Sequence, residues 1–180
     1  LELGALPDVA NANGWTALHW AARRGNVAIV KALLAAKANC NAENKDKWTP
    51  LHQAARGGSA AVIRLLCEAG AMVNAKAKNG ETALAIAANE SHSEAVRVLL
   101  SLGADPCQAD VDGMTALHFA ARPDVAKLLL LHGADLAVVN RHGQTPAKLA
   151  EKNAKVAELL TWAAANPWQN DPAIFEQLKN

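Results

Sequence analysis

Short apolar runs recur along the chain at a nearly constant distance and alternate with polar loops. Each run begins beside a threonine, and the five runs read WTALHWAA, WTPLHQAA, ETALAIAA, MTALHFAA and QTPAKLAE. A spacing of 33 residues separates Thr16, Thr49, Thr82 and Thr115, and Thr145 follows after another 30. A fixed period of this length indicates stacked supersecondary units, because one such unit cannot bury its apolar face alone.

Within each unit the pattern predicts two short helices. The threonine is a good N-cap, and a proline such as Pro50 suits the first helical position after it. In the first unit we expect an inner helix over about 17–24 and, after a turn, an outer helix over about 27–36. The spacing i, i+1, i+4, i+5 gives the outer helix a core stripe that consists of Ile29, Val30, Leu33 and Leu34.

The 33-residue period with the motif T-A/P-L-H-x-A resembles the ankyrin repeat, and the resemblance covers nearly the whole chain. It implies an all-α fold, a solenoid of helix-turn-helix repeats with projecting β-turn or hairpin loops. The last two repeats are each three residues short, and we expect the loss to fall in the turn between the helices, where a solenoid keeps its core. The predicted repeats are 13–45, 46–78, 79–111, 112–141 and 142–165.

Both ends of the chain depart from the period. Residues 1–12 match the end of a preceding repeat, so we interpret them as a truncated repeat or an N-terminal cap. At the other end, residues 166–180 leave the pattern, and a short helix that begins at Asp171 is predicted there. Because terminal repeats need a cover, we expect this helix to seal repeat five with Trp162 or Trp168. A partner-binding tail is the alternative.

Composition and charge narrow the function. The net charge of +1 produces no overall field for nucleic acid or a membrane surface, and no apolar run approaches the roughly 20 residues of a membrane span. The three cysteines have no metal-binding spacing, and their odd number argues against a disulfide framework, which favours a reducing, cytoplasmic location. Because the numbering opens at Leu1 rather than at a methionine, a secreted or periplasmic location stays open.

Motifs for catalysis are absent from the sequence. It contains no phosphate loop, no H-E-x-x-H, no G-x-S-x-G and no dinucleotide fingerprint, so we predict no catalytic residue, cofactor or metal. His19, His52 and His118 recur in T-x-L-H. Helices of adjacent repeats lie about 8–10 Å apart, too far to share a zinc whose ligands lie near 2 Å. We expect these histidines to form hydrogen bonds between neighbouring loops.

The resemblance also indicates where a partner binds. In ankyrin-like proteins the binding surface is built from the loop tips before each threonine and the exposed side of the inner helices. Carried onto this chain, these positions are Trp15, Trp48, Trp20, Arg23, Arg24, Gln53, Arg56, Glu81, Ile86, Asn89, Met114, Phe119 and Arg122.

Two indoles dominate this predicted surface. Trp15 and Trp48 fall one repeat apart at the loop tips, with Trp20 behind them, and interface hot spots are enriched in tryptophan and arginine. The alternative is that Trp20 and Phe119 only thicken the packing of the inner helices. We predict a hydrophobic patch with a basic rim, which receives a protein with apolar and acidic groups.

The sequence therefore predicts a non-enzymatic protein–protein interaction module, acting as a scaffold or as a stoichiometric inhibitor. A targeting or recognition segment of a larger enzyme or secreted effector is the alternative. We expect a monomer that binds no membrane. We also expect no nucleic-acid binding, because acidic residues interrupt the lysines of the loops and leave no continuous basic stripe.

Overall fold

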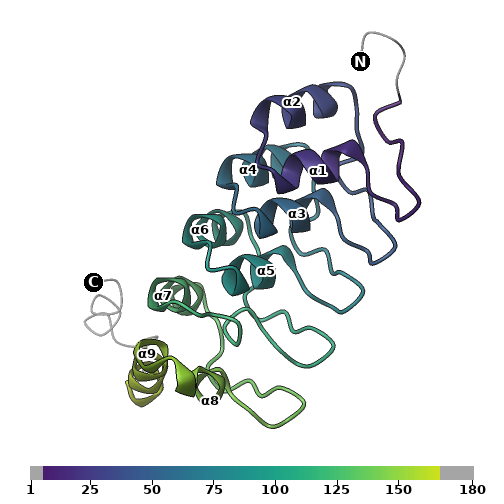
Figure 1. Ribbon diagram of the computed structural model, residues 1–180. Helices are drawn as coiled ribbons and strands as arrows, with labels where there is room; N and C mark the ends of the chain where they lie inside the picture. Colours follow the sequence, from purple (N-terminus) through teal and green to yellow (C-terminus); the bar gives the residue numbers. More distant parts are fainter. Residues whose placement is uncertain (1–5, 167–180) are drawn as a thin grey trace.

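The computed structural model describes residues 6–166, which form a row of stacked helical hairpins (Figure 1). In each of the first three repeats an inner helix is followed by an outer helix. Inner helices pack on inner helices and outer helices on outer helices along the row. The bounds are α1 Ala17–Arg23 and α2 Val27–Ala35, α3 Pro50–Arg56 and α4 Ala60–Glu68, and α5 Ala83–Asn89 and α6 Ser93–Ser101.

The inner helices begin where the sequence places a threonine. Thr16 and Thr49 have extended backbones, and the Nδ1 atom of the histidine three residues later accepts a hydrogen bond from the threonine N–H, at 3.1 and 3.0 Å. Polar side chains cap the outer helices of the first two repeats, where Asn26 Oδ1 accepts from the N–H of Ile29 at 3.1 Å and Ser59 Oγ accepts from the N–H of Val62 at 3.4 Å. Each cap satisfies a backbone group that the helix leaves without a partner.

A continuous hydrophobic core runs between the inner and outer helices. It contains the leucine two residues after the threonine in the first four repeats and the leucine on the outer helix in the first three. Burying one such side chain stabilises the fold by about 1.5–3 kcal/mol. These buried leucines are Leu18, Leu51, Leu84 and Leu117, and Leu33, Leu66 and Leu99. The predicted core stripe of the first outer helix is wrong at Ile29, which is 49% exposed, whereas Val30 beside it is fully buried.

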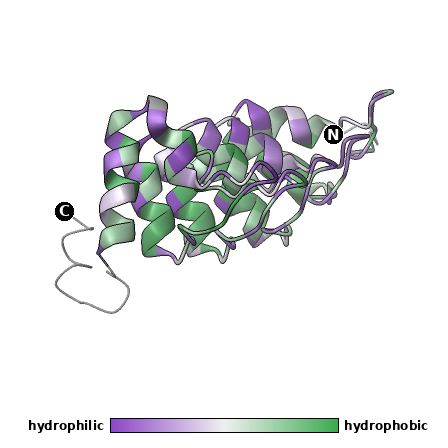
Figure 2. Cartoon of the chain, turned by 90° about the horizontal axis from the view of Figure 1, so that it is seen from below, coloured by the Kyte–Doolittle hydropathy of each residue, from purple (hydrophilic) through white to green (hydrophobic). Residues whose placement is uncertain are grey.

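The loops before the threonines project from the helices to one side (Figure 2). Backbone hydrogen bonds link each loop to the next, and a turn at Gly80 shows how closely they approach. Gly80 has φ +83°, and a Cβ there would lie 2.8 Å from Val111 N and 2.9 Å from Asp110 Cα. The four linking bonds join Lys45 N to Asn13 O, Lys78 N to Asp46 O, Val111 N to Asn79 O and Arg141 N to Asp112 O.

Repeats four and five depart from the helix pattern of the first three. Repeat four has the outer helix α7, and residues 116–119, where an inner helix would lie, form only turns. Repeat five has a short inner helix that continues as a 3-10 turn before a longer outer helix. The bounds are α7 Pro123–Leu131, α8 Pro146–Leu149, η1 Ala150–Lys152 and α9 Ala154–Ala165.

The three-residue loss in repeat four thus removes helix rather than turn, and the prediction of an intact inner helix is wrong there. The N-cap of the outer helix falls ten residues after the threonine in the first repeat but seven after it in the fourth, at Arg122. Because Val125 and Leu129 are fully buried, the outer helix keeps its place in the core. The chain between threonine and outer helix is then too short for an inner helix.

The all-α fold class is confirmed, since the described residues contain helices, turns and two isolated bridges but no strand. Near the N-terminus, Asp8 Oδ1 accepts from Asn39 N–H at 2.8 Å, as Asn41 Oδ1 accepts from Met72 N–H one repeat later at 2.9 Å. Residues 6–12 therefore make the loop contact of a repeat. The predicted capping helix lies outside the described residues.

Candidate protein-binding surface

The first cluster of the predicted surface lies on α1 and the loop before it. The rings of Trp15 and Trp20 stack at a tilt of 36°, with centroids 5.4 Å apart, and Trp15 meets His19 edge-on at 5.3 Å. Trp20 is 51% exposed. The structure thus brings two of the predicted indoles together, and one of them presents about half of its surface to solvent.

Trp48, one repeat further on, has a mixed environment. Its indole is half-buried and packs against the core, so packing accounts for part of its presence. The ring centroid lies 5.8 Å from the His52 ring and 5.6 Å from Arg56 Cζ, which is a cation–π distance. Arg56 also forms an exposed ion pair with Glu90, at 3.6 Å. Trp48 therefore contributes to the packing of repeat two as well as to the predicted surface.

The repeated histidines hold the loop tips in place. His19 Nε2 bonds Trp48 O at 2.9 Å, His52 Nε2 bonds Glu81 O at 3.2 Å, and His118 Nε2 bonds Gln144 O at 3.2 Å. Since Nδ1 accepts from the threonine N–H, Nε2 carries the proton and donates. The predicted hydrogen bonds between neighbouring loops are confirmed.

Burial holds these histidines in the neutral form. It lowers the pKa of His52 to about 4 and lowers the pKa of His19 and His118 as well. A neutral ring suits the geometry, because a protonated Nδ1 would face the threonine N–H with a second donor. The carbonyl groups of Trp48 and Glu81 are therefore fixed by donors that stay in one tautomer at neutral pH.

Two predicted surface residues are buried. Gln53 and Ile86 are only 2% and 5% exposed, so their side chains cannot contact a partner, and the prediction is wrong at these positions. Gln53 lies on α3, between α1 and α5, and Ile86 lies on α5, between α3 and repeat four. Trp20, by contrast, lies on α1, the first inner helix of the described residues. Closely packed neighbours cover this helical position in the middle of the row.

The other predicted residues reach the surface to different degrees. Trp20, Arg23, Arg24, Arg56, Asn89 and Arg122 are exposed, while Trp15, Trp48, Glu81, Met114 and Phe119 are half-buried. Arg23 and Arg24 form no ion pair with a carboxylate of the described residues, so they present free positive charge beside Trp20. Arg122 differs, because Asp124 binds it through two hydrogen bonds of 3.0 Å. Within residues 6–166, the arginines of the predicted basic rim that have no ion pair are thus Arg23 and Arg24, both in the first repeat.

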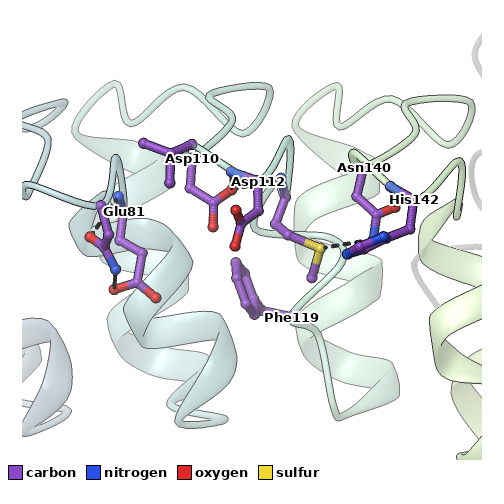
Figure 3. Close-up of a pocket in the computed structure, with 9 residues that line it drawn as sticks. Glu81, Asp110, Asp112, Phe119, Asn140 and His142 are labelled. Atoms are coloured by element: carbon purple, nitrogen blue, oxygen red, sulfur yellow. Dashed lines mark hydrogen bonds between the residues drawn. The ribbon is translucent and has the colours of Figure 1, made fainter.

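Two hollows lie between the loop tips, and sequence reasoning missed both. The tryptophan hollow, of about 320 Å³, is lined by Asp46, Trp48, Lys78 and Asn79. The acidic hollow, of about 370 Å³, shares Asn79 and contains the Phe119 ring beneath the carboxylates of Asp110 and Asp112 (Figure 3). Its remaining lining is Glu81, Val111, Met114, Asn140 and His142. The sequence showed these acidic residues only as interruptions between the lysines of the loops.

The described residues also bear on metal and thiol chemistry. Residues 6–166 contain no group of three or more metal-binding side chains, and none of their buried polar side-chain atoms lacks a hydrogen-bond partner. Burial raises the pKa of the Cys67 thiol to about 11, which keeps it protonated and unreactive at neutral pH.

A row of helical hairpins with linked loops and a broad exposed face defines a solenoid of the repeat-protein class. The family model of ankyrin repeats matches three overlapping stretches, residues 1–77, 25–110 and 73–140. The chain belongs to the ankyrin repeat family, whose repeats are protein–protein interaction modules and are generally not catalytic. No curated protein matches the sequence at a significant level. No helix among residues 6–166 has the length and apolar character needed to cross a membrane.

Proposed function

We propose that the chain is a non-enzymatic module that binds a partner protein through the tryptophan patch, defined as Trp15, Trp20 and Trp48. The observation that carries the proposal is the stacked Trp15–Trp20 pair, which leaves Trp20 51% exposed beside Arg23 and Arg24, two arginines that no carboxylate of the described residues pairs with. Large exposed aromatic side chains with adjacent arginines are typical of interface hot spots. Neither the caps nor the core of the first repeat needs an indole at Trp20.

The chemistry of the patch defines the partner. Apolar side chains of the partner would cover the indoles, and its carboxylates would pair with Arg23 and Arg24. The histidine bonds hold the loop tips before binding, so little conformational entropy is lost when the partner docks. The proposal covers a scaffold and a stoichiometric inhibitor. An inhibitor would abolish the partner's own activity at a one-to-one ratio, whereas a scaffold would bind without that effect.

The test uses the double variant Trp15→Ala/Trp48→Ala and a matched control, Ile29→Ala/Met72→Ala. The control removes two exposed apolar side chains, 49% and 56% accessible, that lie outside the inner helices and the loop tips before the threonines. Proteins captured from the source cells by the wild-type chain are identified, and the affinity of each purified candidate is measured by calorimetry. We expect the Trp variant to bind at least about 30-fold more weakly, the effect of one hot spot, and the control to bind as wild type.

Folding must be separated from binding in this test, because Trp48 packs partly against the core. Circular dichroism and thermal unfolding report whether the Trp variant keeps its helices. The second variant, Arg23→Glu/Arg24→Glu, changes only exposed side chains and is expected to slow association with the same partner. A partner that binds both variants with wild-type affinity would refute the proposal.

A further inference from the structure

The acidic hollow and the tryptophan hollow are neighbours that differ in charge. They share Asn79, and the first is bordered by three carboxylates, Glu81, Asp110 and Asp112, whereas the second is lined by one lysine and one aspartate, Lys78 and Asp46, beside the Arg56–Trp48 pair. An excess of carboxylates over cations is therefore a feature of the acidic hollow and not of the tryptophan hollow.

The charge of Asp110 is not required by its loop. Asp110 Oδ1 accepts two backbone N–H groups, from Asp112 and Met114, both at 2.8 Å. The equivalent residues in other loops accept the same pair of bonds with a neutral amide oxygen, and they are Asn11, Asn44 and Asn140. The loop needs an acceptor, so the negative charge at Asp110 is additional to its structural role.

The carboxylates of the acidic hollow are not neutralised by their own neighbours. Among the described residues, Arg141 pairs with Asp112, while Glu81 accepts only the neutral amide of Asn79, at 2.7 Å. Three carboxylates and one arginine leave an excess of two negative charges around a hollow of about 370 Å³. This excess of negative charge favours a cationic group in the hollow, near the carboxylates of Glu81 and Asp110.

Phe119 gives the hollow an aromatic base. It occupies the helical position at which Gln53 and Ile86 are buried, yet it is half-exposed, because the shortened fourth repeat has no inner helix to turn it inward. Asp110 and Asp112 direct their carboxylates toward the space above the ring (Figure 3). A guanidinium group stacks on aromatic rings and pairs with carboxylates, and this combination suits an arginine better than a lysine.

We propose that the acidic hollow binds an arginine side chain of the partner protein while an apolar and acidic part of the same partner covers the tryptophan patch. The inference rests on the proposed function of that surface. Trp48 and Phe119 lie two repeats apart, which at about 10 Å per repeat is about 20 Å, and an extended chain spans this distance in about six residues. The surface therefore selects a partner segment with apolar and acidic residues at one end and an arginine about six residues further on.

The test uses small probes whose binding is located by NMR. N-acetyl-arginine methylamide is titrated against the ¹⁵N-labelled chain, and N-acetyl-citrulline methylamide, which has the same shape without the charge, serves as the control. We expect saturable shifts at the amides of Met114, Phe119 and His142, with citrulline at least about fivefold weaker. Asp110→Asn/Glu81→Gln should weaken arginine binding about fivefold, and Phe119→Leu about threefold. Glu94→Gln, on an outer helix, should leave it unchanged.

The Asp110→Asn variant is expected to fold, because the asparagines at the equivalent position of three other loops accept the same backbone hydrogen bonds. Equal shifts with arginine and citrulline, or shifts spread over the outer helices, would overturn the inference. If the arginine probe does not bind but a captured partner still depends on Trp15 and Trp48, the inference fails and the proposed function stands. If the Trp variant keeps full affinity for its partner, the proposed function fails whatever the probe does.

Discussion

At the scale of single residues, one histidine joins three parts of a repeat. His52 Nδ1 accepts from the N–H of Thr49 at 3.0 Å, its Nε2 bonds the Glu81 carbonyl of the next loop, and its ring lies against Trp48. These contacts use the neutral ring in one tautomer. The same residue therefore caps a helix, links two repeats and supports an indole of the binding patch.

This arrangement predicts that stability falls in mild acid. The pKa of His52 is lowered from 6.5 to about 4 by burial, so the unfolded chain binds a proton between these values and the folded chain does not. The contribution is fully present above about pH 6.5 and is lost progressively toward pH 4. For His52 alone, moving from pH 7.5 to pH 5 should cost about 2 kcal/mol of unfolding free energy.

Urea unfolding of the wild type and His52→Ala at the two pH values measures this contribution. Alanine is tolerated in the fold, because Ala85 occupies the same place in repeat three, where Thr82 Oγ1 caps the helix. We expect the variant to be less stable at pH 7.5 but to lose less stability on acidification. An identical pH dependence of stability in both proteins would contradict the claim that His52 causes the loss of stability in acid.

The residues of the surface were only partly predictable. The position of a residue within its repeat predicts which side of the stack it lies on, and this prediction placed Trp15, Trp20 and Trp48 on the same side. The exposure of a residue also depends on the neighbouring repeats. Their packing buries Gln53 and Ile86, although these residues occupy the same position in their repeats as the exposed Trp20 does in the first. The charge of the acidic hollow was not predicted either, because it comes from residues 81, 110 and 112, which only the stacking of two loops brings together.

At the scale of the helices, the first three repeats follow the sequence pattern closely. The predicted inner and outer helices of repeat one begin at the same residues as α1 and α2, because a threonine cap and an asparagine cap define these starts. Their predicted ends lie within one residue of the observed ends. Repeat four could not be predicted in the same way. The sequence pattern shows that repeat four is three residues short, but it does not show which element is shortened. The inner helix is lost because the outer helix keeps its buried face in the core.

Restoring the missing residues should therefore restore the helix. Insertion of Arg-Gly-Asn after Arg122 would copy the segment 24–26 that joins α1 to α2. We expect residues 116–122 to become helical in NMR backbone shifts and Phe119 to turn inward, as Ile86 does. The arginine probe should then bind more weakly, because its aromatic base is lost. An inserted chain that keeps turns at 116–119 would show that the deletion is not the cause.

At the scale of the whole molecule, the stack presents a face that varies along its length. Helices, core and loop links repeat with little change, whereas the side chains at the loop tips change from indole to carboxylate. In a solenoid each repeat contacts mainly its neighbours, so surface residues can vary without disturbing the fold. The repeating part was predictable because it recurs in every unit, and the variable part carries the proposed function.

The most direct test of the binding surface observes the indoles in the complex. The chain has five tryptophans, and each indole N–H gives its own NMR signal. With a partner identified by capture, we expect the indole signals of Trp15, Trp20 and Trp48 to shift or broaden on binding, while the amide signals of α2, α4 and α6 stay unchanged. Perturbation confined to the outer helices, with these three indole signals unchanged, would contradict this expectation.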